Sequence, residues 1–126
     1  MHKIIAILLI IVGVIHLLPL SGVLGTEQLT SLYGLSLQES NISILMRHRA
    51  ILFGVFGLFF IYSAFNKKYQ PLAFIAGFIS VLSFLFLAWS VGDYNAAIRK
   101  VVVADLVALA CLLVALVLYL VQMRQQ

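Results

Sequence analysis

The sequence predicts an all-α protein, an antiparallel four-helix transmembrane bundle with a short interfacial helix between the first and second spans. Hydrophobic residues make up 64% of the 126 residues and charged residues only 10%, whereas soluble domains carry about 25% charge. The apolar residues also form four stretches with short polar breaks, and a bilayer core about 30 Å thick needs roughly 20 apolar residues per helix. We therefore expect one transmembrane domain over residues 1–126.

The first predicted span covers residues 4–18. It ends before Pro19, because proline disfavours helix at the preceding residue. The longest connection follows. Within it, the segment from Thr26 to Tyr33 begins with a capping residue and has apolar side chains at helical spacing. This pattern predicts a short helix at the membrane interface, ending at Gly34.

The remaining predicted spans cover residues 42–65, 71–91 and 96–123. Pro71 suits the first turn of its helix. The polar turn from Gly92 to Asn95 offers a C-cap residue to the third span and an N-cap residue to the fourth.

Polar residues gather at one end of this predicted bundle. Because consecutive spans run antiparallel, the end of the first, the start of the second, the end of the third and the start of the fourth share one side of the membrane. The opposite side receives Lys3, Lys67, Lys68 and Arg124. The amino terminus adds positive charge there, so the positive-inside rule favours both termini in the cytoplasm.

The strongest local signal is Arg47-His48-Arg49, directly before an apolar stretch. Helical spacing places Arg47 on a stripe of small residues, so we expect it to face the bundle. Asp105 lies about two turns into the fourth span, where a carboxylate requires a cation. Arg47 is its natural partner. Their pair is either a buried structural ion pair or part of a ligand-binding or proton-handling site.

Further polar residues on this side complete the candidate site. The predicted ligand-binding residues are Arg47, His48, Arg49, Asp105, His16, Asn95 and Arg99. We assign no catalytic residue and expect no cofactor. His16, His48 and Asp105 lack a metal-site motif, and the sole cysteine, Cys111, rules out a disulfide or a paired thiolate site.

The short polar signatures resemble a known family. Leu32-Tyr33-Gly34, Arg47-His48-Arg49-Ala50, Leu52-Phe53-Gly54 and Asp105 are similar to those of small bacterial DoxX-like membrane proteins, a group of uncharacterised function. The resemblance implies a multi-pass four-helix protein of the bacterial cytoplasmic (inner) membrane. Some relatives of the wider superfamily are linked to quinone-dependent sulfur oxidation or to the assembly of other membrane proteins. Sterol-isomerase-type proteins share the architecture but carry more intramembrane acids and tryptophans.

Three functions stay open on the sequence alone. The first is binding of a lipid, quinone-like or other amphipathic molecule at the polar end, with Phe53, Phe56, Phe84 and Phe86 along its apolar part. The alternative is an interaction or assembly protein that docks a membrane partner or a second copy of itself. The third is an enzyme of lipid or redox chemistry that uses His16 or His48 as acid or base. Nucleic acid is not an expected partner.

Overall fold

The computed structural model describes residues 2–19 and 40–125, and this part of the protein is helical apart from short turns at 65–66 and 92–95. No strand occurs within those two ranges. Four α-helices and one short 3-10 helix follow each other along the chain: α1 (His2–Leu17), α3 (Ser40–Ala64), η2 (Lys67–Tyr69), α4 (Gln70–Val91) and α5 (Ala96–Arg124). The helices begin at residues 2, 40, 70 and 96, where the sequence predicts 4, 42, 71 and 96. The predicted interfacial helix at 26–33 lies outside the described residues.

Three of the helical segments are long and apolar enough to cross a membrane. They cover 24 residues of α3, 25 residues of η2 and α4 together, and 29 residues of α5. The apolar helix α1 is shorter, with 16 residues, which at 1.5 Å per residue gives a length of about 24 Å. These lengths and compositions indicate a membrane protein.

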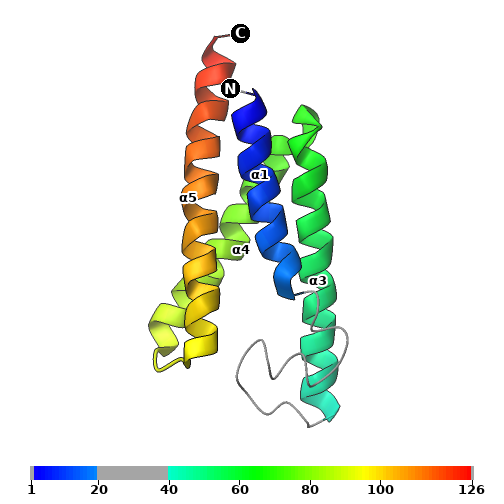
Figure 1. The fold of residues 1–126 in the computed structure, drawn as a ribbon, viewed down its shortest axis with the longest axis vertical. Helices are drawn as coiled ribbons and strands as arrows, with labels where there is room; N and C mark the ends of the chain where they lie inside the picture. Colours follow the sequence, from blue (N-terminus) through cyan, green and yellow to red (C-terminus); the bar gives the residue numbers. More distant parts are fainter. Residues whose placement is uncertain (1, 20–39, 126) are drawn as a thin grey trace.

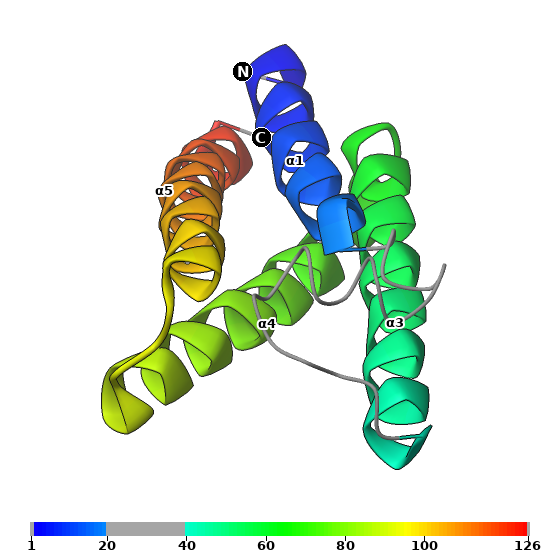
Figure 2. The same cartoon turned by 60° about the horizontal axis from the view of Figure 1, so that its bottom comes forward.

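The helix α1 lies between α3 and α5 and packs along both (Figure 2). The helix α4 packs along α5 but makes little direct contact with α3. The core contains side chains from every helix, with Leu9, Phe60, Val81 and Leu112 among its fully buried members. Large apolar side chains also cover the outside of all four helices, as expected for a surface in contact with lipid tails.

Two glycines let α1 and α3 approach at backbone distance. A Cβ atom added to Gly13 would lie 2.8 Å from the carbonyl oxygen of Gly57, and one added to Gly57 would lie 2.7 Å from the carbonyl oxygen of Gly13. Gly54 and Ala50 are buried one and two turns before Gly57. The stripe of small residues on this helix therefore does face a neighbouring backbone, as its spacing predicts.

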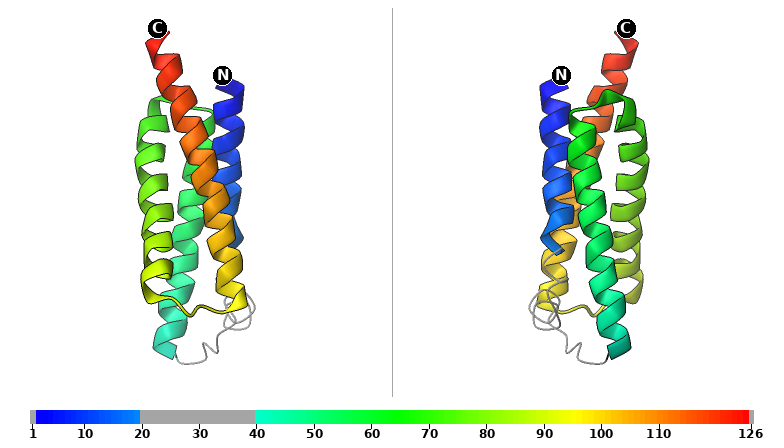
Figure 3. Two further views of the ribbon diagram at one scale, coloured as in Figure 1. Left: turned by 90° about the vertical axis from the view of Figure 1, so that its left-hand side faces the viewer. Right: turned by 90° about the vertical axis from the view of Figure 1, so that its right-hand side faces the viewer.

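The start of α1 and the end of α5 lie at the same end of the molecule (Figures 1 and 3). The Lys67 ammonium donates to the His2 ring over 2.8 Å, and the Gln122 side chain contacts the same ring. This end carries the cationic residues that the sequence places on the same side as the chain termini, Lys3, Lys67, Lys68 and Arg124. The end of α1, the start of α3, the end of α4 and the start of α5 meet at the opposite end.

Candidate functional site

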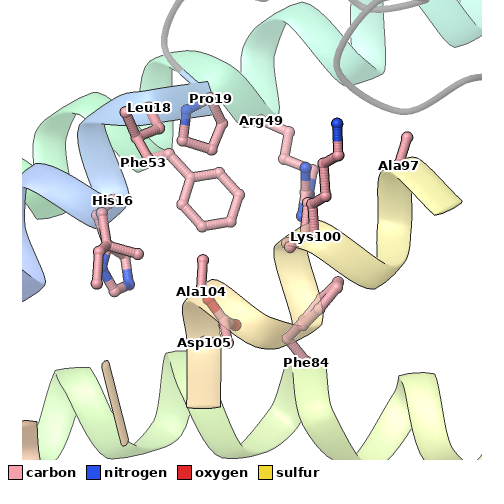
Figure 4. Close-up of a pocket in the computed structure, with 12 residues that line it drawn as sticks. His16, Leu18, Pro19, Arg49, Phe53, Phe84, Ala97, Lys100, Ala104 and Asp105 are labelled. Carbon is pink, nitrogen blue, oxygen red and sulfur yellow. The ribbon is translucent and has the colours of Figure 1, made fainter. Parts of the chain in front are cut away.

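A cavity of about 260 Å³ lies at this opposite end, where all four α-helices meet. Its polar lining consists of His16, Arg49, Lys100 and Asp105. Figure 4 shows Arg49 and Lys100 on one side of the cavity and His16 on the other, with Ala104 and Asp105 between them. The rest of the lining is apolar: Ile15, Leu18, Pro19, Phe53, Phe84, Ala97, Val101 and Ala104.

Arg49 and Asp105 line the same cavity and interact electrostatically. Both side chains are half-buried, and the positive charge of Arg49 acts on the carboxylate of Asp105. The Arg49 Cζ atom also lies 4.5 Å from the centroid of the Phe53 ring, a cation–π distance. Within the described ranges, no hydrogen-bond donor reaches the Asp105 carboxylate.

The prediction that Arg47 faces the bundle and pairs with Asp105 is wrong. The Arg47 side chain is exposed, and Arg49 lines the cavity in its place. Leu17, the last residue of α1, contacts Gly57. Arg47 precedes Gly57 by ten residues, about 15 Å along the helix. At the depth of Arg47, the small-residue stripe no longer has α1 to face.

His16 is almost fully buried, at 2% exposure, and both ring nitrogens have partners. Nδ1 lies 2.9 Å from the Val12 carbonyl oxygen and Nε2 lies 3.0 Å from the Ser80 hydroxyl. A carbonyl only accepts, so Nδ1 carries the hydrogen and Nε2 of the neutral ring accepts from Ser80. The histidine therefore ties α1 to α4 and presents its ring to the cavity. Ser83 donates to the Ser80 carbonyl over 3.0 Å, the back-bonding expected of a serine within a membrane helix.

Lys100 is a site residue that the sequence analysis missed. It lies on one face of α5 with Ala97, Val101, Ala104 and Asp105, all of which line the cavity. Spacings of three and four residues connect these positions. Lys100 follows Ala97 by three residues and precedes Ala104 by four, so the face of small residues, and not the position of Asp105, is the signal that could have selected it.

The remaining predicted residues lie away from the cavity. His48 is exposed. Asn95 caps α5, because its side-chain oxygen accepts from the Ile98 amide over 2.8 Å. Arg99 lines a separate hollow at the turn between α4 and α5, together with Trp89, Asp93 and Tyr94.

No protein-family model, no curated protein and no solved structure matches this chain. The resemblance to DoxX-like proteins therefore stays a prediction from short motifs. Of the residues that carry it, the structure brings Arg49, Phe53 and Asp105 together at the cavity, while residues 32–34 lie outside the described ranges.

An apolar groove of about 590 Å³ adjoins the cavity on the side where α3 and α4 make little contact. Arg49, Phe53 and Phe84 line both spaces. Phe56 lines the groove, as expected, but Phe86, expected beside the same ligand, is exposed and packs near Trp89 instead. A cavity with four polar side chains thus borders an apolar groove on the outside of the bundle.

Metal ligands do not cluster in the described ranges. Within residues 2–19 and 40–125, no group of three or more His, Cys, Asp and Glu side chains lies close enough to hold a metal ion. The chemistry of the cavity is that of hydrogen bonding and charge, supplied by a guanidinium, an ammonium, a carboxylate and an imidazole.

Proposed function

We propose that this protein binds a lipid, a quinone-like compound or another amphipathic small molecule at the polar end of an antiparallel four-helix transmembrane bundle. The proposal rests on one observation: the cavity with polar side chains and the apolar groove lie side by side and share lining residues. The cavity has four polar side chains, the groove beside it is almost wholly apolar, and Arg49, Phe53 and Phe84 belong to both.

This arrangement suits a molecule with a polar head and an apolar body. Ligand sites are mostly apolar, with a few convergent polar groups that fix orientation. Arg49 supplies a planar fork of donors, and Asp105 acts on it electrostatically from the facing helix. The groove lies on the outer surface between α3 and α4, so a membrane-dissolved molecule would enter sideways from the lipid.

The membrane topology belongs to the same proposal. We propose that all four helices span the cytoplasmic membrane of a bacterium, as in DoxX-like proteins, with both termini in the cytoplasm. Support comes from α1, whose first residue contacts the end of α5 while His16 and Pro19 reach the cavity at the other end. The short α1 therefore extends along much of the bundle despite its 16 residues.

A space-filling variant tests the proposal. Ala104 lines the cavity, and Ala110 on the same helix faces outward. We would purify wild type, Ala104→Phe and Ala110→Phe with their membrane lipids and record native mass spectra. The expected result is a small molecule bound to wild type and Ala110→Phe and absent from Ala104→Phe, because the added ring occupies the cavity.

Two results would count against binding. Wild type with no bound small molecule, or equal retention by both variants, would mean that the cavity is not a ligand site. Wild type that retains a partner protein or a second copy, with no small molecule, would support the docking alternative.

A further inference from the structure

We infer that the turn between α4 and α5 forms a second binding site, for the head group of a zwitterionic phospholipid. A hollow of about 440 Å³ lies at this turn, at the end of the molecule opposite the chain termini (Figure 1). Its lining consists of Ala88, Trp89, Gly92, Asp93, Tyr94 and Arg99. None of these six residues lines the cavity or the apolar groove. The inference therefore goes beyond the proposed function and is tested separately from it.

The hollow holds one side chain of each charge. Asp93 and Arg99 are both exposed, and in the described part of the chain they form no ion pair with each other. A head group with an ammonium and a phosphate would meet both charges, with the ammonium beside the carboxylate and the phosphate beside the guanidinium. A purely anionic head group has no group for Asp93, and a purely cationic one has none for Arg99.

Two aromatic side chains at the hollow favour the ammonium. Trp89 is 80% exposed and Tyr94 is 37% exposed. Within the described ranges, the ring contact of Trp89 is with Phe86, at 6.3 Å between centroids. The face of a tryptophan ring attracts a cation more strongly than that of tyrosine or phenylalanine. The ammonium of a bound head group would thus be attracted by a carboxylate and by an aromatic ring.

The position of the hollow identifies a membrane lipid as the source of the zwitterion. A guanidinium binds carboxylate as well as phosphate, so charge alone does not name the anion. The apolar segment Lys67–Val91 is long enough to cross a membrane, and the turn with Asp93 follows directly after it. Tryptophan and tyrosine at such helix ends lie at the level of the lipid head groups. The anion at that level is the phosphate of a phospholipid.

An apolar path leads from the hollow along the outside of α4. Leu82 and Phe86 precede Trp89 by seven and three residues, which places all three on one face of the helix. All three side chains are exposed. The acyl chains of a lipid with its head group in the hollow would lie along this face.

The fluorescence of Trp89 tests the site directly, because this residue is the only tryptophan of the chain. Protein in neutral detergent micelles is titrated with three lipids that carry the same brominated acyl chains, since bromine quenches tryptophan on contact. Their head groups are phosphoethanolamine, phosphoglycerol and trimethylammonium. We expect the phosphoethanolamine lipid to reach half-maximal quenching at about fivefold lower mole fraction than either of the others, the size of a surface ion pair with a cation–π contact.

Variants assign each preference to one charge. Asp93→Asn should lower the preference for the phosphoethanolamine lipid over the phosphoglycerol lipid about threefold, because the ammonium loses its carboxylate. Asparagine suits this position because Asp93 has a φ of 52°, a left-handed conformation that asparagine tolerates. Arg99→Gln should lower the preference over the trimethylammonium lipid by a similar factor. Arg124→Gln, at the opposite end of the molecule, is the control and should change neither preference.

Three results would overturn the inference. They are equal quenching by the three lipids, both preferences unchanged in Asp93→Asn and Arg99→Gln, and displacement of the brominated lipid by soluble phosphoethanolamine at the same concentration. The last result would assign the hollow to a free zwitterion. Ala104→Phe, which fills the cavity, should leave the quenching by the phosphoethanolamine lipid unchanged, so a failure of the proposed function would be distinguished from a failure of this site. The variants are compared at equal helix content by circular dichroism.

Discussion

His16 connects the cavity to the groove through its hydrogen bond with Ser80. It lines the cavity, while its partner Ser80 lines the groove. The ring also packs edge-on against Phe60, with 4.8 Å between the ring centroids. A buried imidazole with both nitrogens satisfied and an aromatic neighbour is held in one orientation, which fixes the polar wall that a ligand would meet.

The hydrogen bond between His16 and Ser80 should contribute measurably to stability. We would compare His16→Phe, Ser80→Ala and the double variant by their free energies of unfolding in detergent micelles. The coupling energy is expected to be about 0.6 to 1.7 kcal/mol, the range for hydrogen bonds between membrane helices. Ser90→Ala is the control, because the Ser90 hydroxyl donates within its own helix to Leu87. Full additivity of the two single changes would show that the bond carries no net stability.

The sequence predicted part of the site at residue level. Arg49, Asp105 and His16 meet at the cavity, and each was selected because ionisable groups within membrane spans are rare. The choice of Arg47 over Arg49 failed for a specific reason. The small-residue stripe shows which face of α3 packs on α1, but it does not show that α1 ends near Gly57. Which arginine is covered depends on where the neighbouring helix stops.

At the scale of helices, the crossing of α1 and α3 fixes the position of the cavity wall. Gly13 and Gly57 allow the two backbones to meet, which places His16, one turn after Gly13, beside the aromatic rings of α3. Its ring centroid lies 5.8 Å from that of Phe53 and 6.4 Å from that of Phe56. Close helix packing through small residues is thus what brings the polar end of α1 against α3.

Gly13→Ala should destabilise the protein. The new Cβ would lie 2.8 Å from the Gly57 carbonyl oxygen and 3.3 Å from the Ile61 amide nitrogen, so backbone atoms must move. Overpacking costs about 1–3 kcal/mol, which exceeds the gain of about 0.5–1 kcal/mol from replacing glycine in a helix.

Gly77→Ala is the matched control for this change. At Gly77 the nearest atoms are the side-chain methyls of Leu112, at 3.0 and 3.2 Å, and these can rotate aside. Thermal unfolding in micelles should rank wild type and Gly77→Ala well above Gly13→Ala. Equal midpoints for the two variants would contradict a backbone-to-backbone crossing.

Helix ends were predictable because their signals are local. Proline and the Gly92–Asn95 turn mark the ends of the apolar stretches, and Asn95 does cap α5 through the Ile98 amide. The loose contact between α3 and α4 was not predictable. It depends on the directions that the helices take relative to each other, which no single stretch of sequence specifies.

At the scale of the whole molecule, the polar side chains of the cavity and the apolar groove meet at one end. The end with the chain termini holds cations at the surface, and the other end holds the cavity with Arg49, Lys100 and Asp105. The positions of the polar residues along the four predicted spans indicated this asymmetry. The cavity itself results from four helices of unequal length and unequal contact, with α1 shorter than its neighbours and α3 apart from α4.

The most direct test of the whole arrangement is photo-crosslinking with an amphipathic probe, hexadecanoate that carries a diazirine on its chain. After irradiation in micelles and proteolysis, labelled residues are located by mass spectrometry, with unlabelled hexadecanoate as competitor. If the head lies in the cavity and the chain in the groove, competed labels should fall on α3 and α4 around Phe56, Ile75 and Ile79. Labels spread over outward residues of α5 such as Val114 and Val117, unaffected by the competitor, would contradict a specific site.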